Sequence, residues 1–293
     1  MDRKTFLKSM AILPVTATAM KLSDLNKLTE PLSKTAKMPV LFLGHGSPMN
    51  AIEENEFVTG FRNIAKGIPK PNAILCVSAH WETKGTFVTA MQNPPTIHDF
   101  GGFPQELFAV QYPAPGSPDL AKETKSLITK TQVGLDEKWG LDHGAWSVVK
   151  HLYPYADIPV IQMSMDYSQS PKYHYELSQQ IKSLREKGVL VIGSGNIVHN
   201  LGMVEWRRLN EIFGYDWAIE ANEKMKTYIL NGNHKELINF RSQGKAFDLA
   251  IPTPEHYLPL LYSLALQEKN EEVTLFNDKA VAGALTMTSL RIG

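Results

Sequence analysis

The chain has 293 residues, of which 43% are hydrophobic and 20% are charged, as expected for a globular protein of one large or two small domains. Its 30 basic and 30 acidic side chains cancel, so no basic excess favours nucleic acid as a partner. The single cysteine, Cys76, excludes a disulfide within the chain and a cysteine-rich zinc site. Cys76 lies in an apolar run, and we interpret it as a buried structural thiol. Any metal must therefore be held by histidines and carboxylates.

The first 37 residues differ from the rest of the sequence. They have a basic start and a short apolar stretch at residues 11–20, the outline of a secretory signal, although a disordered N-terminal arm is an equal reading. Arg3 and Lys4 are similar to the twin-arginine pair that directs folded proteins to the periplasm. No run is long and apolar enough to cross a bilayer, so we expect no membrane partner. We expect an arm or signal-like segment at 1–37 and one domain at 38–293.

From residue 38 onward, short apolar strands alternate with amphipathic helices. In chain order the pattern predicts a strand at 39–44, a helix at 53–66, strands at 73–80 and 86–91, helices at 117–131 and 145–153, a strand at 158–165, a helix at 171–188, a strand at 189–195, helices at 216–232 and 254–266, and closing strands at 273–278 and 284–293. Ser117 and Pro118 are typical of a helix start, and Gly188 of a helix end. This alternation predicts an α/β fold, with a largely parallel or mixed central sheet flanked by helices.

In open α/β sheets, ligands bind beyond the carboxyl ends of the strands. Three predicted strands end on, or shortly before, a histidine flanked by glycine or serine, namely His45, His80 and His199. Imidazoles on rigid strand ends suit a divalent metal, and the glycines on both sides of His45 permit close approach. We therefore expect His45 to be a metal ligand.

Six further histidines divide into two groups. His256 begins a predicted helix, His143 precedes another, and His98 lies in a loop, so these three are candidates for the same site. His151, His174 and His234 lie in helical or polar, surface-like stretches, and we interpret them as outside the site. The sequence contains no G-x-S-x-G elbow, H-E-x-x-H helix, P-loop or G-x-G-x-x-G turn after a strand.

Seven motifs carry a family resemblance. They are LFLGHGSPMN, VSAHW, PPTIHDFGGFP, YPAPGSPDLA, DHGAW, GSGNIVHNL and PTPEHYLPLLY. Together they resemble the class III extradiol ring-cleavage dioxygenases, most closely the DOPA extradiol dioxygenase-like branch, from about residue 38 to the end. The resemblance implies an α/β fold with a non-haem divalent metal at the strand ends. It also implies an enzyme, cytoplasmic in most of the family, that opens a catechol ring beside its two hydroxyls with both atoms of O2.

The resemblance also implies roles for individual residues. His45 and His80 fall on two metal-ligand positions, and His256 on a third, with Glu255 as the alternative ligand. His199 is implied as acid/base and is also counted among the metal ligands, while His143 is a second catalytic histidine that contacts substrate or oxygen. His98 and Asp99 are implied at the substrate mouth.

The expected cofactor is one Fe(II) per chain, and the expected small-molecule partners are O2 and a catechol such as L-DOPA, opened to a semialdehyde acid. A neutral set of histidines also suits Zn(II), which has no accessible redox change. The alternative is therefore a zinc-dependent hydrolase or lyase that uses the same histidines to activate water. A non-catalytic metal-binding protein is a third reading, but such a protein would need neither His143 nor His199.

Overall fold

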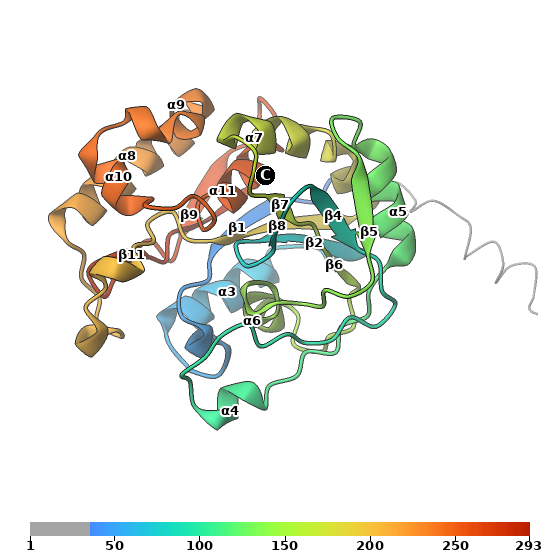
Figure 1. The fold of residues 1–293 in the computed structure, drawn as a ribbon, viewed down its shortest axis with the longest axis horizontal. Helices are drawn as coiled ribbons and strands as arrows, with labels where there is room; N and C mark the ends of the chain where they lie inside the picture. The colour runs from blue at the N-terminus through green and yellow to red at the C-terminus, as the bar shows by residue number, and fades with distance from the viewer. Residues whose placement is uncertain (1–35) are drawn as a thin grey trace, which may run out of the picture. The chain divides into compact units, whose positions relative to one another are not determined.

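A mixed six-stranded sheet forms the centre of the computed structural model, which describes residues 36–293 (Figure 1). The order of its strands is β6-β2-β8-β1-β12-β9. Their bounds are β1 Val40–Gly44, β2 Ala73–Ser78, β6 Val160–Gln162, β8 Val189–Gly195, β9 Val273–Phe276 and β12 Ser289–Ile292. The expected arm or signal at 1–37 lies outside the described residues, apart from Ala36 and Lys37.

Five strands of this sheet run in one direction, and β12 alone among the six runs opposite to them. β2 pairs in parallel with β6 and β8, β8 pairs in parallel with β1, and β12 lies antiparallel to both β1 and β9. The register places Gly44 opposite Gly195, and Ser78 opposite Ser194. Strands β1, β2 and β8 therefore end side by side, so the residues that follow them meet at one edge. The predicted α/β fold with a mixed central sheet is confirmed.

Helices cover both faces of the sheet (Figure 1). On one face, α3 (Glu56–Lys66) and α6 (His143–Leu152) bury Phe61 and Trp146 in a core that includes Cys76, as expected for a structural thiol. On the other face, α11 (Leu258–Leu264) packs against β1 and β8, beside α7 (Pro171–Gln179). A Cβ atom at Gly193 would lie 2.3 Å from the Pro259 carbonyl oxygen, so glycine there lets α11 approach the sheet.

The remaining helices are short or lie away from the central strands. They are α4 Gln105–Phe108, α5 Pro118–Leu127, α8 Asp216–Leu230, α9 His234–Ile238 and α10 Lys245–Ala250. Ser117 caps α5 as predicted, because its side chain accepts a hydrogen bond from the backbone N–H of Leu120. Within residues 36–293, no helix combines the length and the apolarity that a membrane crossing requires.

Several predicted strands belong to small sheets outside the centre. The predicted strand at 86–91 is β4 (Thr86–Thr89), which forms a two-stranded sheet with β5 (Val133–Asp136). The apolar run at 158–165 divides into β6 and β7 (Met165–Asp166), and β7 pairs with β3 (Glu82–Thr83). The predicted closing strand at 284–293 divides similarly into β11 (Leu285–Thr286) and β12. β11 pairs with β10 (Ala280–Val281). An apolar run predicts a strand, but it does not predict the partner of that strand.

Two predicted helices are shorter than expected. Helix α7 ends at Gln179, and the chain continues as a 3-10 turn over Lys182–Lys187. Gly188 closes this segment as predicted, with a left-handed φ of 75°. The predicted helix at 254–266 begins only at Leu258, so His256 lies in the turn before it.

Candidate active site

His45 follows β1 directly, and both neighbouring glycines are required by close contacts. A Cβ atom at Gly44 would lie 2.6 Å from the Met287 carbonyl oxygen, and one at Gly46, where φ is +63°, would lie 2.4 Å from Met287 Sδ. The His45 ring is buried, and its Nδ1 atom lies 3.0 Å from Oγ of Ser194, the last residue but one of the neighbouring strand β8. The glycines therefore let the segment after β1 fold tightly against the chain's final strands while the imidazole is held from β8.

His80 lies two residues past the end of β2 and is oriented by a carboxylate. Its Nδ1 atom is 3.4 Å from Asp99 Oδ2. A carboxylate beside Nδ1 favours the tautomer that carries its proton there, which leaves a lone pair on Nε2. That Nε2 atom lies 3.3 Å from His45 Nε2.

His256 approaches the same point from the turn before α11. Its carbonyl oxygen accepts a 2.9 Å hydrogen bond from the backbone N–H of Asn196. A Cβ atom at Gly195 would lie 2.1 Å from that oxygen, so only glycine permits this contact at the end of β8. Glu255 Oε1 lies 3.1 Å from His256 Nδ1 and accepts a hydrogen bond from the Thr253 hydroxyl.

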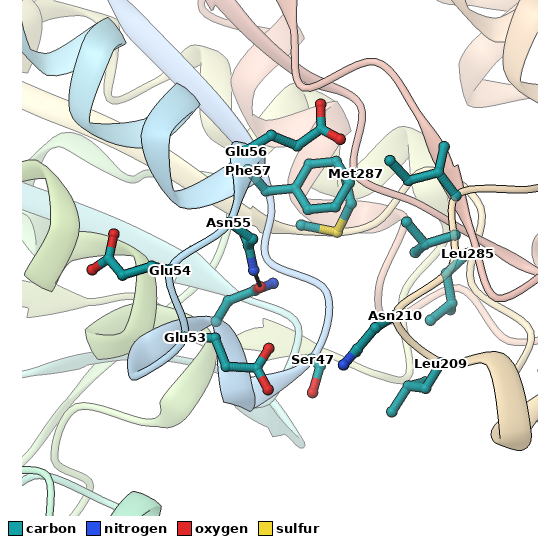
Figure 2. A pocket seen from close by; sticks show the side chains of 13 residues that line it. Ser47, Glu53, Glu54, Asn55, Glu56, Phe57, Leu209, Asn210, Leu285 and Met287 are labelled. Carbon is teal, nitrogen blue, oxygen red and sulfur yellow. Dashed lines mark hydrogen bonds between the residues drawn. The ribbon is translucent and has the colours of Figure 1, made fainter.

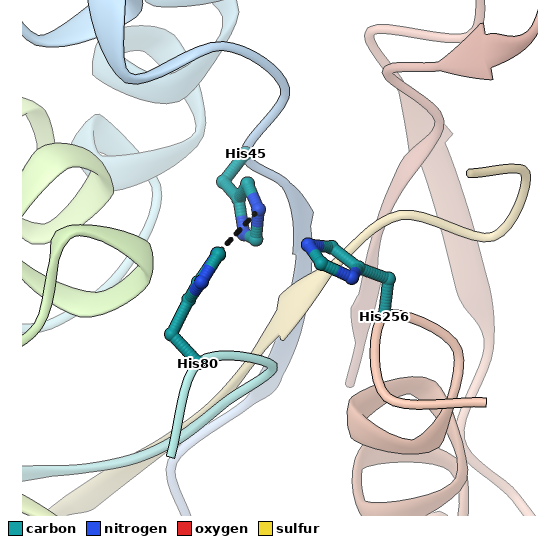
Figure 3. Close-up of side chains that lie close together, drawn as sticks. All are labelled: His45, His80 and His256. Atoms are coloured by element: carbon teal, nitrogen blue, oxygen red, sulfur yellow. Dashed lines mark hydrogen bonds between the residues drawn. The ribbon is translucent and has the colours of Figure 1, made fainter. Parts of the chain in front are cut away.

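The three imidazoles converge from separate parts of the chain (Figure 3), with one nitrogen from each within 4.8 Å of the others. Each Nδ1 atom has an oxygen neighbour, on Ser194, Asp99 or Glu255 respectively. With a proton on each Nδ1, the Nε2 lone pairs of His45 and His80 face each other at 3.3 Å and repel each other unless a cation lies between them. Two nitrogens that each bind one metal at about 2.1 Å in a tetrahedral arrangement lie about 3.4 Å apart. These residues therefore fit a divalent metal.

The electrostatics of the cluster keep its rings neutral at pH 7. Burial lowers the pKa of His80 to about 3, and the adjacent His143 adds to the effect. Burial also lowers the pKa of His45 and of His256 well below its usual value, since each is surrounded by the other imidazoles. Neutral imidazoles have a free lone pair, which is the form that binds metals.

His143 and Asp99 form a second group beside the first. His143 is the first residue of α6, whose N-cap is Asp142, and its ring centroid is 3.8 Å from that of His80. The Asp99 carboxylate bridges the two rings, because Oδ2 lies 3.0 Å from His143 Nδ1 as well as 3.4 Å from His80 Nδ1. Burial opposes its ionisation, but the contacts with His143 hold the pKa of Asp99 below its usual value.

His199 stacks face to face on His256, with ring centroids 3.5 Å apart and an interplanar angle of 8°. Its backbone N–H donates to the Ala250 carbonyl oxygen, which fixes the segment after β8. Burial lowers the pKa of His199 to about 4, so this ring is also neutral at pH 7. It can therefore accept a proton.

These histidines line one cavity of about 240 Å³. Its other walls are mostly apolar or aromatic and include Phe100, Phe103, Leu201, Trp206, Leu209 and Leu285. A polar cluster on one wall and apolar side chains on the others are typical of a site that binds an aromatic small molecule.

Comparison with known proteins is consistent with this geometry. Residues 35–281 match the family described as the catalytic LigB subunit of aromatic ring-opening dioxygenase. The chain belongs to this family of extradiol ring-cleavage dioxygenases.

Named relatives support the assignment over most of the chain. A protein of Escherichia coli K12 named 4,5-DOPA dioxygenase extradiol is 44% identical over 266 residues, which cover 89% of this chain and 97% of that protein. A protein of the same name from Beta vulgaris is 34% identical and covers 85% of this chain and 94% of its own length. The crystal structure of an uncharacterized E. coli K12 protein superposes with a TM-score of 0.76 at 40% identity, over 88% of this chain and all of that one.

The other predicted candidate, His98, lies outside the cluster of this dioxygenase. Its Nε2 atom is 2.9 Å from the Val110 carbonyl oxygen, and its ring packs against Trp146 and Phe100. His98 does not line the 240 Å³ cavity; its ring packs against Phe100, which does.

His151, His174 and His234 lie outside the cluster as expected, but their surroundings are not surface-like. His151 and His174 are buried, at 6% and 0% exposure. Nε2 of His151 hydrogen-bonds to the Asn50 carbonyl oxygen, and Nδ1 of His174 to the Tyr262 hydroxyl. His234 contacts the Tyr175 hydroxyl. These three histidines are therefore structural residues packed within the fold, although the sequence around them is polar.

No role was predicted for Ser194, and Asp99 was predicted only at the substrate mouth. Ser194 lies in the GSG segment that ends β8, and Asp99 follows His98 directly in the IHDFGGFP motif. A polar residue at a strand end was a usable signal for Ser194, because the site was expected there. No local signal indicates that Asp99 contacts two histidines distant in sequence.

Proposed function

We propose that this dioxygenase uses a single divalent metal, Fe(II), to open the ring of a catechol such as L-DOPA with O2 and release a semialdehyde acid. The observation that carries the proposal is the convergence of His45, His80 and His256 in an otherwise apolar cavity, with two more histidines beside them. The names of the E. coli and Beta vulgaris relatives support DOPA as the substrate. Residues 38–293 would then form the catalytic domain, after an arm at 1–37.

In this proposal, His45, His80 and His256 hold the metal through Nε2, since their Nδ1 atoms face Ser194, Asp99 and Glu255. Glu255 orients His256 through its Oε1 atom, which Thr253 and His256 engage, and it is the alternative metal ligand. Bound there, Fe(II) would supply open coordination positions for the two catechol oxygens and O2, and the redox change that joins them.

His199 acts as acid and base. It lines the catalytic cavity and stacks on His256, which places it next to any substrate bound at the cluster. Because burial keeps its ring neutral, with a pKa of about 4, it can accept the proton of a catechol hydroxyl and return a proton later. The same position makes it the candidate for a fourth ligand.

His143 positions the reacting groups. Asp99 beside its Nδ1 atom favours a proton there, so Nε2 carries the lone pair and can accept a hydrogen bond in the cavity. The walls formed by Phe100, Phe103 and Trp206 contact the aromatic ring and exclude water from it.

Oxygen uptake by the protein loaded anaerobically with Fe(II) tests the proposal, with L-DOPA as substrate and the yellow semialdehyde followed by absorbance. We expect uptake and yellow product together with Fe(II), and neither with a matched Zn(II)-loaded sample. No uptake with either metal across several catechols would overturn the proposal. Hydrolysis of esters or amides by the zinc form would then favour the zinc hydrolase.

A further inference from the structure

A second cavity, of about 430 Å³, adjoins the catalytic cavity (Figure 2). The two cavities share Ser47, Leu209 and Leu285 in their linings. The second cavity differs in character, because three glutamates line it, namely Glu53, Glu54 and Glu56. A substrate whose ring occupies the catalytic cavity can therefore extend a substituent toward an acidic compartment.

Only one of these glutamates carries an unopposed charge. Arg62 binds Glu54 through two hydrogen bonds of 2.6 and 2.7 Å, and Lys279 binds Glu56 at 2.5 Å. Glu53 forms no ion pair with any residue in the range 36–293. It is only partly exposed, and Figure 2 shows its carboxylate on the side of the cavity where Ser47 and Asn210 lie.

A third cavity, of about 340 Å³, adds a positive charge at the same place. Arg207 and Arg208 line it, and it shares Glu53 and Leu209 with the second cavity and Trp206 and Leu209 with the catalytic cavity, so it lies beside both. Arg208 is paired with Glu211 at 2.7 Å. The guanidinium of Arg207 has no ion-pair partner within the described part of the chain.

The catalytic cavity itself offers no such charges. Among the described residues, its lining contains histidines, Ser47 and otherwise apolar side chains, but no Asp, Glu, Lys or Arg. An ammonium or carboxylate group on a substrate is costly to bury there without a charged partner. A charged substituent must therefore reach the compartments that Glu53 and Arg207 line.

We propose that Glu53 and Arg207 select catechols that carry an amino-acid side chain, with Glu53 binding the ammonium group and Arg207 the carboxylate. The inference rests on the proposed function and defines the substrate class of the same site. Neither residue touches the reacting atoms, so both act on KM and leave kcat unchanged. Glu53 is partly exposed and Arg207 is exposed, so their ion pairs with a substrate contribute modestly, and we expect changes of about fivefold.

Three substrates separate the two contacts. L-DOPA carries both charged groups, dopamine lacks the carboxylate, and 3,4-dihydroxyphenylpropionate lacks the ammonium. Glu53→Gln should raise KM about fivefold for L-DOPA and dopamine and leave that of dihydroxyphenylpropionate unchanged. Arg207→Gln should raise KM for L-DOPA and dihydroxyphenylpropionate and leave that of dopamine unchanged. Glu54→Gln is the matched control, because Arg62 already neutralises Glu54, and it should change none of the three values.

An equal shift with all three substrates, or no shift with any, would overturn the proposal. Anaerobic calorimetric titration of the metal-loaded protein with the same three compounds separates this inference from ring cleavage. If the wild type cleaves no catechol but the same pattern appears in the dissociation constants, the charged contacts stand and the proposed reaction fails. Absence of the pattern from the dissociation constants as well would overturn the assignment of Glu53 and Arg207.

Discussion

Ser194 Oγ lies 3.0 Å from Nδ1 of His45 and donates its own proton to the Gly144 carbonyl oxygen at 2.5 Å. Because the hydroxyl has one proton, it can only accept from His45. His45 must then carry its proton on Nδ1, and its Nε2 lone pair points toward His80. One serine therefore determines the tautomer of a proposed metal ligand.

Replacing this serine should weaken metal binding. In Ser194→Ala, His45 loses the acceptor at Nδ1, and we expect the affinity for Fe(II) or Zn(II) to fall about tenfold in competition with a chelator. Ser178→Ala is the matched control, because Ser178 is equally buried and its hydroxyl donates from α7 to the Tyr262 carbonyl oxygen in α11. Both variants should lose about 1 kcal/mol of stability. Equal metal affinity in the two variants would contradict the role of Ser194.

Asp99→Asn removes the charge that contacts both His80 and His143. We expect a drop in metal affinity of about tenfold and a larger drop in turnover, since one change loosens a ligand and a substrate-positioning ring together. Metal titration and single-turnover kinetics measure the two effects separately. Asp136→Asn, which alters a carboxylate that only accepts from two backbone N–H groups, should leave both unchanged. If turnover falls only in proportion to metal occupancy, Asp99 acts through His80 alone.

His199→Ala should keep the metal and lose turnover. The three proposed ligands remain, whereas the proton acceptor is gone, so kcat should fall by about 10²- to 10⁴-fold. Metal content by elemental analysis, together with the rate of oxygen uptake, tests this. Stoichiometric loss of metal from the variant would instead place His199 among the ligands.

The Arg185–Glu271 pair should give the protein an acid-sensitive component of stability. Arg185 is fully buried and binds Glu271 through hydrogen bonds of 2.6 and 2.8 Å. Burial alone would raise the pKa of Glu271, but the hydrogen bonds from Arg185, from the Glu268 backbone N–H and from Lys37 hold it at about 2. Since this pKa is lower in the folded than in the unfolded state, the stabilisation is complete above about pH 4.5 and is lost as the pH falls toward 2.

Urea unfolding of Glu271→Gln measures this contribution. At pH 7 the variant should be less stable by about 3–5 kcal/mol, because the Arg185 charge stays buried without its partner. The difference from wild type should shrink as the pH is lowered from about 4.5. A difference that stays constant between pH 7 and pH 3 would show that Glu271 stabilises the fold without its charge.

Much of the fold was predictable because the central strands are continuous apolar runs. Both faces of β1, β2 and β8 are buried, so nearly every residue in them is apolar and the pattern is unambiguous. The small sheets were not predictable in the same way. β5 (Val133–Asp136) has one buried residue and one exposed apolar one, and its sequence differs little from a loop.

The site was predictable only as far as its positions follow from topology. His45 and His80 lie beyond strand ends, where a site was expected, and the structure brings His256 and His199 to them. The tautomers depend on Ser194, Asp99 and Glu255, and two of these contact their histidines only after the chain has folded. Such long-range contacts produce no pattern in the sequence from which they could be predicted.

The first strand of the sheet, β1, lies between β8 and β12, the last strand of the chain. Its partners therefore begin about 150 residues and end about 250 residues away along the sequence, and such long-range pairings form slowly. During synthesis, β1 therefore lacks one of its two partner strands until β12 has been made. A chain that ends before β12 would leave the backbone N–H and C=O groups along one edge of β1 without their partner strand.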